Sequence, residues 1–290
     1  MGRAASATGT ASMHPSLRAL RTRRHTLPTL SAVAMEVWQL ARSDGFDFTR
    51  LERTLERDRV LAGKVLSRAC APERCSLHPP QSLRDAVSRL GSSGIADIVL
   101  EVAVTMQVFR APGYEAVADA YRRHALAVAR LGGPAARETG CDPGAVFVAG
   151  LLHDVGAMAV LLVAGDEARR RGKTPPSHAS MIPVLGDLTP EASAYLAETW
   201  GFPDDIVGAI RRHRQDDAKE DPLGRALGLA HALAATEAEC PGPCDPPPAG
   251  GAFDPADFDL SRRAGERLVL TAHDVGAALN PPPMKENPSP

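Results

Sequence analysis

The dipeptide His153-Asp154, in the stretch LLHDVG, joins two side chains that bind divalent metal ions well. Imidazole nitrogens and carboxylate oxygens are ordinary protein ligands of zinc, iron and manganese, so this pair could form part of a metal site. The same letters, HDVGA, return at His273-Asp274. That second copy lies in a helix-like run of apolar residues that need burial, and we interpret it as incidental.

Three other histidines support the interpretation of His153-Asp154 as part of a metal site. His124, His213 and His231 each fall on the apolar face of a different predicted helix. Buried polar side chains need partners, so histidines that point inward from separate helices indicate a shared site. The alternative is that each imidazole makes one hydrogen bond to a carbonyl or to Asp154 and only satisfies the core. The candidate metal ligands are His124, His153, Asp154 and His213, with His231 as a further candidate.

A metal ion at these residues would support phosphoester hydrolysis, because it polarises a phosphoryl oxygen and lowers the pKa of bound water to about 7. The arginines that flank His124 and His213 could bind the phosphate; they are Arg122, Arg123, Arg211, Arg212 and Arg214, with Arg123 and Arg212 as the leading candidates. Solvated helix faces often carry arginines, which is the alternative interpretation of all five. The sequence has no glycine-rich phosphate loop. No residue is assigned a catalytic role.

The five cysteines do not suggest a secreted disulfide framework, because their number is odd and they are scattered. Cys240 and Cys244 are spaced C-x3-C, which would suit zinc if His231 or His273 joined them, but no second cysteine pair exists. The alternative for this stretch is a solvent-exposed linker. We therefore expect a reducing, cytoplasmic location.

The charge balance bears on possible partners. Lys and Arg number 33 against 35 Asp and Glu, so the formal net charge is −2. This balance gives no global attraction to nucleic acid or anionic lipid, and we expect no nucleic-acid partner. We also expect no membrane partner, because we identify no run of about 18 apolar residues.

Composition and periodicity predict an all-α fold. The chain is 44% hydrophobic but has only 2 Trp, 3 Tyr and 7 Phe, which is typical of helical cores filled by Leu, Val and Ala. No strand pattern competes. Helices are predicted over 30–41, after Asp47, from Val60 to before Pro72, from Ser82 to a break at Gly91 and Gly94, and over 95–108, 115–131, 144–163, 191–199, 204–213, 222–238 and 260–279.

Two boundaries concern the candidate site. The run Gly132-Gly133-Pro134 is predicted to end the helix that carries His124. Asp142-Pro143 supplies an N-cap and an N1 proline for an apolar helix over 144–163, which we expect to be the central helix of the fold.

Proline and glycine clusters divide the chain into segments. We expect two helical lobes joined by a hinge at Pro112-Gly113. The basic N-terminal segment is interpreted as disordered, with an organelle transit peptide as the alternative. The predicted segments are a lead-in over 1–26, a first lobe over 27–110, a second lobe over 112–238, a linker over 239–258, a closing helix over 259–280 and a disordered tail over 281–290.

Several stretches together carry a resemblance to a known family. They are LPTLSAVAMEVWQLARS at 27–43, RDRVLAGKVLSRA at 57–69, SLRDAVSRLG at 82–91, HALAVARL at 124–131, FVAGLLHDVG at 147–156 and AYLAETWGFPDDIVGAIRRH at 194–213. In letters, order and spacing they resemble the HDOD domain, a bacterial relative of the HD phosphohydrolase superfamily. The resemblance covers nearly 27–235 and implies an N-terminal helical lobe packed on an HD-like helical lobe.

The resemblance also implies a ligand set, from which this chain departs. The metal ligands of catalytic HD relatives resemble His124, His153 and Asp154, followed by a distal Asp. The distal position here corresponds to His231, which leaves a bound metal with more net positive charge. Thr189 or Pro190 stands where relatives tend to carry a His before the AYL segment, and no GYP triplet follows the HD pair. Cyclic-dinucleotide phosphodiesterase chemistry is therefore poorly supported.

The function that the resemblance implies is a non-catalytic bacterial signalling module with a degenerate HD site, acting on a regulatory protein partner. One alternative is a metal-dependent phosphohydrolase of nucleotides or cyclic nucleotides, against which Thr189 and His231 count. Another is a sensor that binds a nucleotide without turning it over. If a metal is bound, we expect iron, manganese or zinc.

Overall fold

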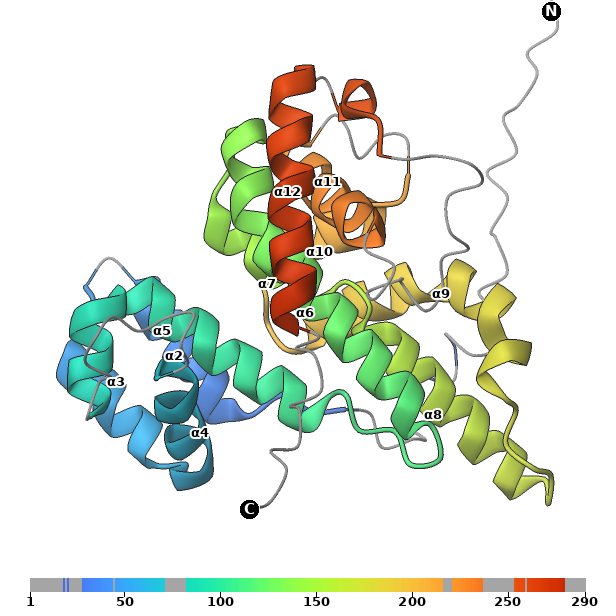
Figure 1. Cartoon of the computed structure of the whole chain (residues 1–290). Coiled ribbons are helices and arrows are strands. Elements are labelled where there is room, and N and C mark those ends of the chain that lie inside the picture. Colours follow the sequence, from blue (N-terminus) through green and yellow to red (C-terminus); the bar gives the residue numbers. More distant parts are fainter. Residues whose placement is uncertain are drawn as a thin grey trace, which may run out of the picture.

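The computed structural model describes residues 18, 20, 28–43, 45–70, 82–215, 221–236, 253–258 and 260–279. Throughout these residues the regular structure is helical, which confirms the all-α prediction (Figure 1). The expected tail, Cys240 and Cys244, nearly all of the expected lead-in and residues 239–252 of the expected linker lie outside the described residues. Of the expected linker, the structure describes a short 3-10 helix, η2, over Pro255–Phe258.

The first lobe contains α2 (Ala32–Ala41), α3 (Phe48–Glu56), α4 (Arg59–Ala69) and α5 (Leu83–Gln107). Side-chain oxygens of Ser31, Asp47, Asp58 and Ser82 cap these four helices at their N-termini. Gly91 has φ 72° and ψ 173°, and it breaks the helical path of α5. Gly94, where a second break was predicted, lies within the continuing helix.

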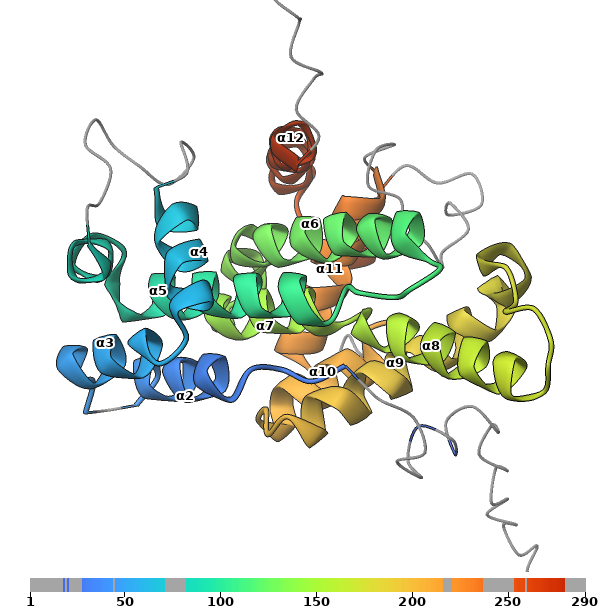
Figure 2. The ribbon, with the colours of Figure 1, turned by 90° about the horizontal axis from the view of Figure 1, so that it is seen from below.

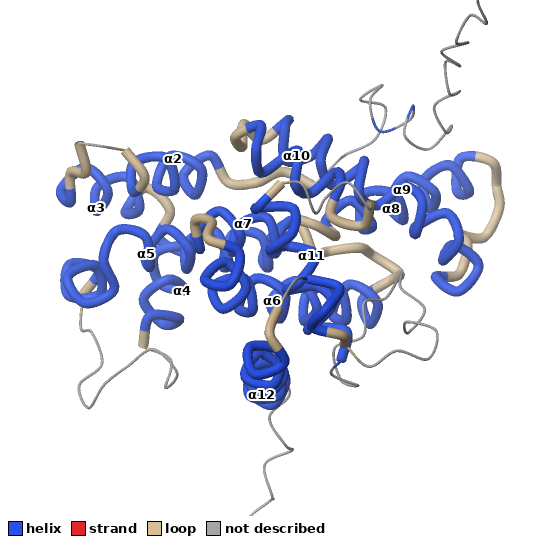
Figure 3. The backbone as a smooth tube through the Cα atoms, turned by 90° about the horizontal axis from the view of Figure 1, so that it is seen from above, coloured by secondary structure: helices blue, strands red, loops and turns tan. Residues whose placement is uncertain are grey.

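The second lobe contains α6 (Glu115–Thr139), α7 (Pro143–Leu152), α8 (Val155–Arg170), α9 (His178–Thr199), α10 (Asp204–Arg212) and α11 (Pro222–Thr236). Helix α7 packs against α6, α10 and α11. In Figures 2 and 3 the first lobe lies to one side of α6 and α7, and α8 and α9 extend on the other side. This arrangement places α7 centrally in the fold.

The predicted end of α6 at Gly132-Gly133-Pro134 is wrong. The helix includes Pro134 and runs on to Thr139, and it ends at Gly140 with a left-handed φ of 74°. Gly132 serves packing instead, because a Cβ there would lie 3.0 Å from Val146 Cγ1 of α7. The close approach of two helices, rather than chain termination, explains this glycine.

The single central helix predicted over 144–163 is also wrong, because the chain breaks into α7 and α8 at His153-Asp154. A Cβ on Gly156 would lie 2.3 Å from the backbone nitrogen of Ser193, so α8 passes very close to α9. The backbone N–H of Gly156 donates to Ser193 Oγ at 2.8 Å. This bond to α9 supports the amide at the break, where helical bonds are interrupted.

Helix α9 begins at His178, well before the predicted 191–199, and contains Pro183 and Pro190. A proline inside a helix removes one backbone hydrogen bond, yet α9 continues through both of them. Helix α12 (Arg262–Leu279) packs on α6 and α11 (Figure 1).

Contacts between the lobes join α2 to the second lobe. Arg42 Nη2 lies 2.7 Å from Asp142 Oδ2, at the N-terminus of α7. The rings of Trp38 and Phe202 meet edge to face with centroids 5.0 Å apart. These contacts support the predicted packing of the first lobe on the second.

The expectation that no segment is apolar enough to cross a membrane needs a correction. Pro143–Arg170 meets that criterion by length and composition, with a mean hydropathy of 2.2. However, 89% of its apolar window is buried inside the fold. The segment is α7 and α8, whose apolar side chains are part of the protein core.

Candidate metal centre

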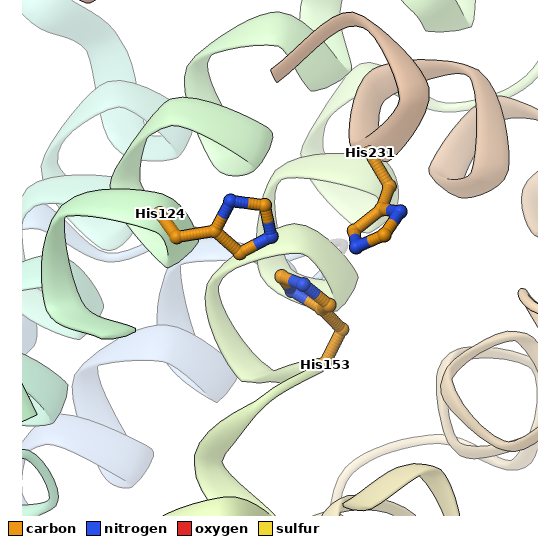
Figure 4. Close-up of side chains that lie close together, drawn as sticks. All are labelled: His124, His153 and His231. Carbon is orange, nitrogen blue, oxygen red and sulfur yellow. The ribbon is translucent and has the colours of Figure 1, made fainter. Parts of the chain in front are cut away.

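Five polar side chains from separate helices or helix ends converge on α7. His124 lies in the middle of α6, His153 and Asp154 lie between α7 and α8, His213 follows α10, and His231 lies on α11. Figure 4 shows the rings of His124, His153 and His231 facing one another. The side chains of His124, His153 and Asp154 have no exposed surface. The structure thus brings together all five residues that the sequence singled out as candidate ligands.

The distances within the cluster suit a metal ion. Ring centroids of His124, His153 and His231 are 5.1 to 5.3 Å apart, and one nitrogen from each ring lies within 4.8 Å of the others. Asp154 Oδ2 lies 3.3 Å from His153 Nε2 and 3.8 Å from His124 Nε2. The centroid of His213 lies 5.3 Å from that of His153. The three imidazoles of His124, His153 and His231 could hold a metal ion.

Hydrogen bonds orient the two histidines at helix ends. Nδ1 of His153 lies 2.7 Å from the carbonyl oxygen of Gly150, and Nδ1 of His213 lies 2.7 Å from that of Ile210. A carbonyl can only accept, so both Nδ1 atoms donate and both Nε2 atoms keep a lone pair in the neutral ring. This is the usual arrangement of a metal-binding histidine, with the second nitrogen held by a backbone carbonyl.

Two buried atoms test whether a metal fits here. Neither His153 Nε2 nor Asp154 Oδ2 has a hydrogen-bond partner among the described residues. An unsatisfied buried lone pair is costly, and these two atoms lie 3.3 Å apart on one side of the cluster. The donor set of imidazole and carboxylate matches what zinc, iron and manganese accept. The residues present therefore fit a divalent ion.

The electrostatics of the cluster favour a charged carboxylate at Asp154 and a neutral imidazole at His213. Burial raises the pKa of Asp154, but His153, Arg214 and His124 outweigh it and hold the pKa well below its ordinary value. Burial, followed by the positive charges of its neighbours, holds the pKa of His213 well below 6.5. Asp154 is thus ionised and His213 neutral at neutral pH, and these are the forms that bind metals.

Arg214, which the sequence offered only as one of five arginines that could bind phosphate, belongs to the centre. Its Nη2 donates to Asp154 Oδ1 at 3.1 Å and its Nε donates to His213 Nε2 at 3.3 Å. The available signal was its place directly after His213. Only the turn that follows α10 aims the guanidinium inward, which helical periodicity does not reveal.

The two leading candidates for phosphate binding contact other carboxylates. Arg123 pairs with Asp119 on α6, and Arg212 Nη2 lies 3.5 Å from Asp221 Oδ2. The structure shows no contact of either guanidinium with the five clustered side chains.

One further position bears on the ligand set. Thr189 is fully buried, and its Oγ1 has no hydrogen-bond partner among the described residues. It lies one helical turn before Ser193, whose hydroxyl accepts a hydrogen bond from the N–H of Gly156.

His273 and Asp274, the second copy of the motif, are both exposed on α12. Their exposure agrees with the interpretation of that copy as incidental.

Solved structures share this fold. An HDOD domain protein of unknown function from Geobacter sulfurreducens aligns with a TM-score of 0.69 at 21% identity, covering 92% of this chain and 96% of the other. A protein provisionally described as a metal-dependent phosphohydrolase, from Shewanella amazonensis, has a TM-score of 0.64 at 18% identity, with coverage of 91% and 96%. One provisionally described as a signal transduction protein, from Marinobacter aquaeolei, has a TM-score of 0.63 at 21% identity, with coverage of 91% and 64%.

At these identities the likeness establishes the fold, and the sequence establishes the family. No curated protein matches the chain by sequence. The family profile of the HDOD domain matches residues 27–216, from the start of the first lobe to just beyond Arg214. His231 lies outside that match, on α11. Because the match spans well over half of the sequence, the chain belongs to the HDOD domain family.

Proposed function

We propose that this protein is a non-catalytic signal-transduction module, in which the buried histidine cluster holds one structural divalent ion. The observation that carries this proposal is that His124, His153 and Asp154 have no exposed side-chain surface. A phosphoester substrate must reach a metal-bound nucleophile, so a catalytic metal site keeps an open position. A closed site with satisfied ligands contributes folding energy instead.

The ligands of the ion would be His124, His153, His231 and Asp154. When bound, the metal supplies a positive charge that satisfies the lone pairs these side chains direct at one another. The carbonyl of Gly150 holds His153 in the tautomer that leaves Nε2 facing the cluster. Imidazole-rich sites suit zinc, iron and manganese to different degrees, and we propose an ion from this group.

The departures from catalytic HD relatives support a loss of turnover. His231 stands at the distal position, where catalytic HD relatives carry an Asp, which leaves Asp154 as the carboxylate of the cluster. Thr189 or Pro190 stands where relatives tend to carry a further His. Arg123 and Arg212 are paired with Asp119 and Asp221, so these arginines are not positioned for a phosphate at the centre.

Metal analysis combined with an activity screen tests the proposal. We expect wild-type protein purified without chelator to contain one equivalent of iron, manganese or zinc by plasma mass spectrometry. His153→Ala should lose this metal, and metal addition should raise the Tm of the apo wild type but not of the variant. Neither should hydrolyse nucleotides, cyclic nucleotides or cyclic dinucleotides. Metal-dependent turnover that His153→Ala abolishes would contradict the non-catalytic proposal.

A metal-dependent phosphohydrolase is the second candidate, favoured by one specific observation. The side chain of Arg214 is 20% exposed, so the centre has a cationic group that solvent reaches on one side. The similarity to a provisionally described phosphohydrolase adds to this candidate. The same screen decides between the two, since only the hydrolase predicts product formation.

We further propose that the module acts in the cytoplasm by binding a regulatory protein. The membership in the HDOD family and the similarity to a provisionally described signal transduction protein support this step. Affinity purification from the native host, followed by a binding assay with the recombinant partner, tests it. His153→Ala should bind that partner with unchanged affinity if it stays folded. A strictly metal-dependent interaction would contradict a purely structural ion.

A further inference from the structure

The centre has more donor groups than one tetrahedral ion requires. Four imidazoles and one carboxylate gather there, whereas zinc in structural sites takes four ligands. The two oxygens of the Asp154 carboxylate face different groups. Its Oδ2 faces His153 and His124 at 3.3 and 3.8 Å, and its Oδ1 faces Nη2 of Arg214 at 3.1 Å.

Arg214 also engages the remaining histidine. Its Nε donates to Nε2 of His213 at 3.3 Å, while Nδ1 of that ring donates to the carbonyl of Ile210. Both ring nitrogens of His213 are therefore in use. The guanidinium bridges His213 Nε2 and Asp154 Oδ1, two atoms that could otherwise bind a metal ion.

We propose that Arg214 occupies the place of a second cation and limits the centre to one divalent ion. This inference rests on the metal centre proposed above. A guanidinium does not lose its proton in proteins, so its positive charge is permanent. A second ion would have to displace it from both donor atoms, and would meet a like charge at short range in a poorly solvated site. Arg214 is in this sense a residue that determines metal stoichiometry.

Metal stoichiometry of the full-length protein tests the inference. Apo protein is titrated with Co²⁺ and followed by visible absorption, and plasma mass spectrometry then counts the ions retained after gel filtration. We expect one ion in the wild type and two in Arg214→Gln. Arg214→Met, a second uncharged variant, should also bind two. Arg212→Gln is the matched control, since it removes an adjacent arginine that pairs with Asp221, and it should bind one.

Two more variants distinguish the effect of the positive charge at position 214 from the effect of the His213 imidazole as a ligand. Arg214→Lys should stay at one ion because the cation is kept. His213→Ala combined with Arg214→Gln should return to one ion, because the second site loses its imidazole.

The ion counts distinguish a failure of the proposed role of Arg214 from a failure of the metal centre. One ion in wild type, Arg214→Gln and Arg214→Met alike would overturn the role of Arg214 and leave the metal centre standing. Two ions in wild type would also overturn it. No ion in wild type would overturn the metal centre itself, and the inference would fall with it.

Discussion

Nη2 of Arg214 donates to Oδ1 of Asp154 at 3.1 Å, although the two residues lie 60 positions apart in the chain. This contact ties the turn after α10 to the break between α7 and α8. The other oxygen of Asp154 faces His153. A single carboxylate therefore balances a guanidinium on one side and a candidate metal site on the other.

Replacement of Asp154 is expected to destabilise the metal-free protein. Asp154→Ala removes the acceptor of Arg214 and leaves buried polar groups unsatisfied, which typically costs about 1–3 kcal/mol. Urea unfolding in the presence of chelator, followed by far-ultraviolet circular dichroism, measures this loss. Asp274→Ala is the matched control, because it alters the exposed second copy of the motif and should change stability by less than about 0.5 kcal/mol. Equal free energies of unfolding for the two variants would contradict a structural role for the ion pair.

We expect the metal-free protein to lose stability in mild acid because His213 is buried. Burial holds its pKa in the folded state well below 6.5. The unfolded chain therefore takes up a proton below about pH 6.5 while the folded protein does not. Stability from this residue is complete above that pH and falls as the pH decreases, by at most about 1.4 kcal/mol per pH unit.

His213→Gln provides the comparison for this pH dependence. Free energies of unfolding measured by urea titration between about pH 7 and 5 should fall less steeply in the variant, because one proton fewer is taken up on unfolding. His178, whose pKa burial also lowers, is unchanged in both proteins and contributes equally. Parallel pH profiles would show that His213 is not held neutral in the fold.

Gly156→Ala should be strongly destabilising, because the new Cβ would lie 2.3 Å from the backbone nitrogen of Ser193. Backbone cannot rotate away as a side chain can, so α8 and α9 must separate, and overpacking of this kind costs about 1–3 kcal/mol or more. Thermal unfolding measures the effect. Gly186→Ala on α9 is the control, since nothing lies within 4 Å of its Cβ, and it should stabilise the protein by about 0.4–1 kcal/mol. Similar Tm values for both variants would mean that α8 and α9 separate at little cost.

The sequence predicted local features of the fold well. Helix starts were predicted at Asp47, Ser82 and Asp142, and the side chain of each accepts a hydrogen bond from the first turn of its helix. Their side chains act within three residues, so the relevant physics is visible in the sequence. The apolar stripes likewise located the clustered histidines, because periodicity shows which face of a helix is buried.

Features that depend on distant contacts could not be predicted. The residues on either side of the pair His153-Asp154 are apolar or glycine, so they do not show that α7 ends there and that the N–H of Gly156 bonds to Ser193 of α9. Pro134 likewise reads as a helix stop, but α6 continues through it because the helix is packed along its length. Arg214 joined the centre only through a turn whose direction tertiary packing determines.

The ion pair between Arg42 and Asp142 is expected to contribute modestly to lobe association. Asp142 accepts the N–H groups of Gly144 and Ala145, and it pairs with Arg42 at 2.7 Å. The side chains of the pair are 35% and 51% exposed, so solvent screens their attraction and the coupling should be about 0.2–1 kcal/mol.

A double-mutant cycle separates this pair from the cap. Asp142→Asn keeps a capping oxygen and loses the charge, whereas Asp142→Ala also loses the cap, which typically costs about 1 kcal/mol. Combined with Arg42→Ala, Asp142→Asn gives the coupling energy from free energies of unfolding in urea. This energy should shrink when the salt concentration is raised, because exposed charges are screened. A coupling above about 2 kcal/mol that salt does not reduce would mean that the pair is desolvated and locks the lobes together.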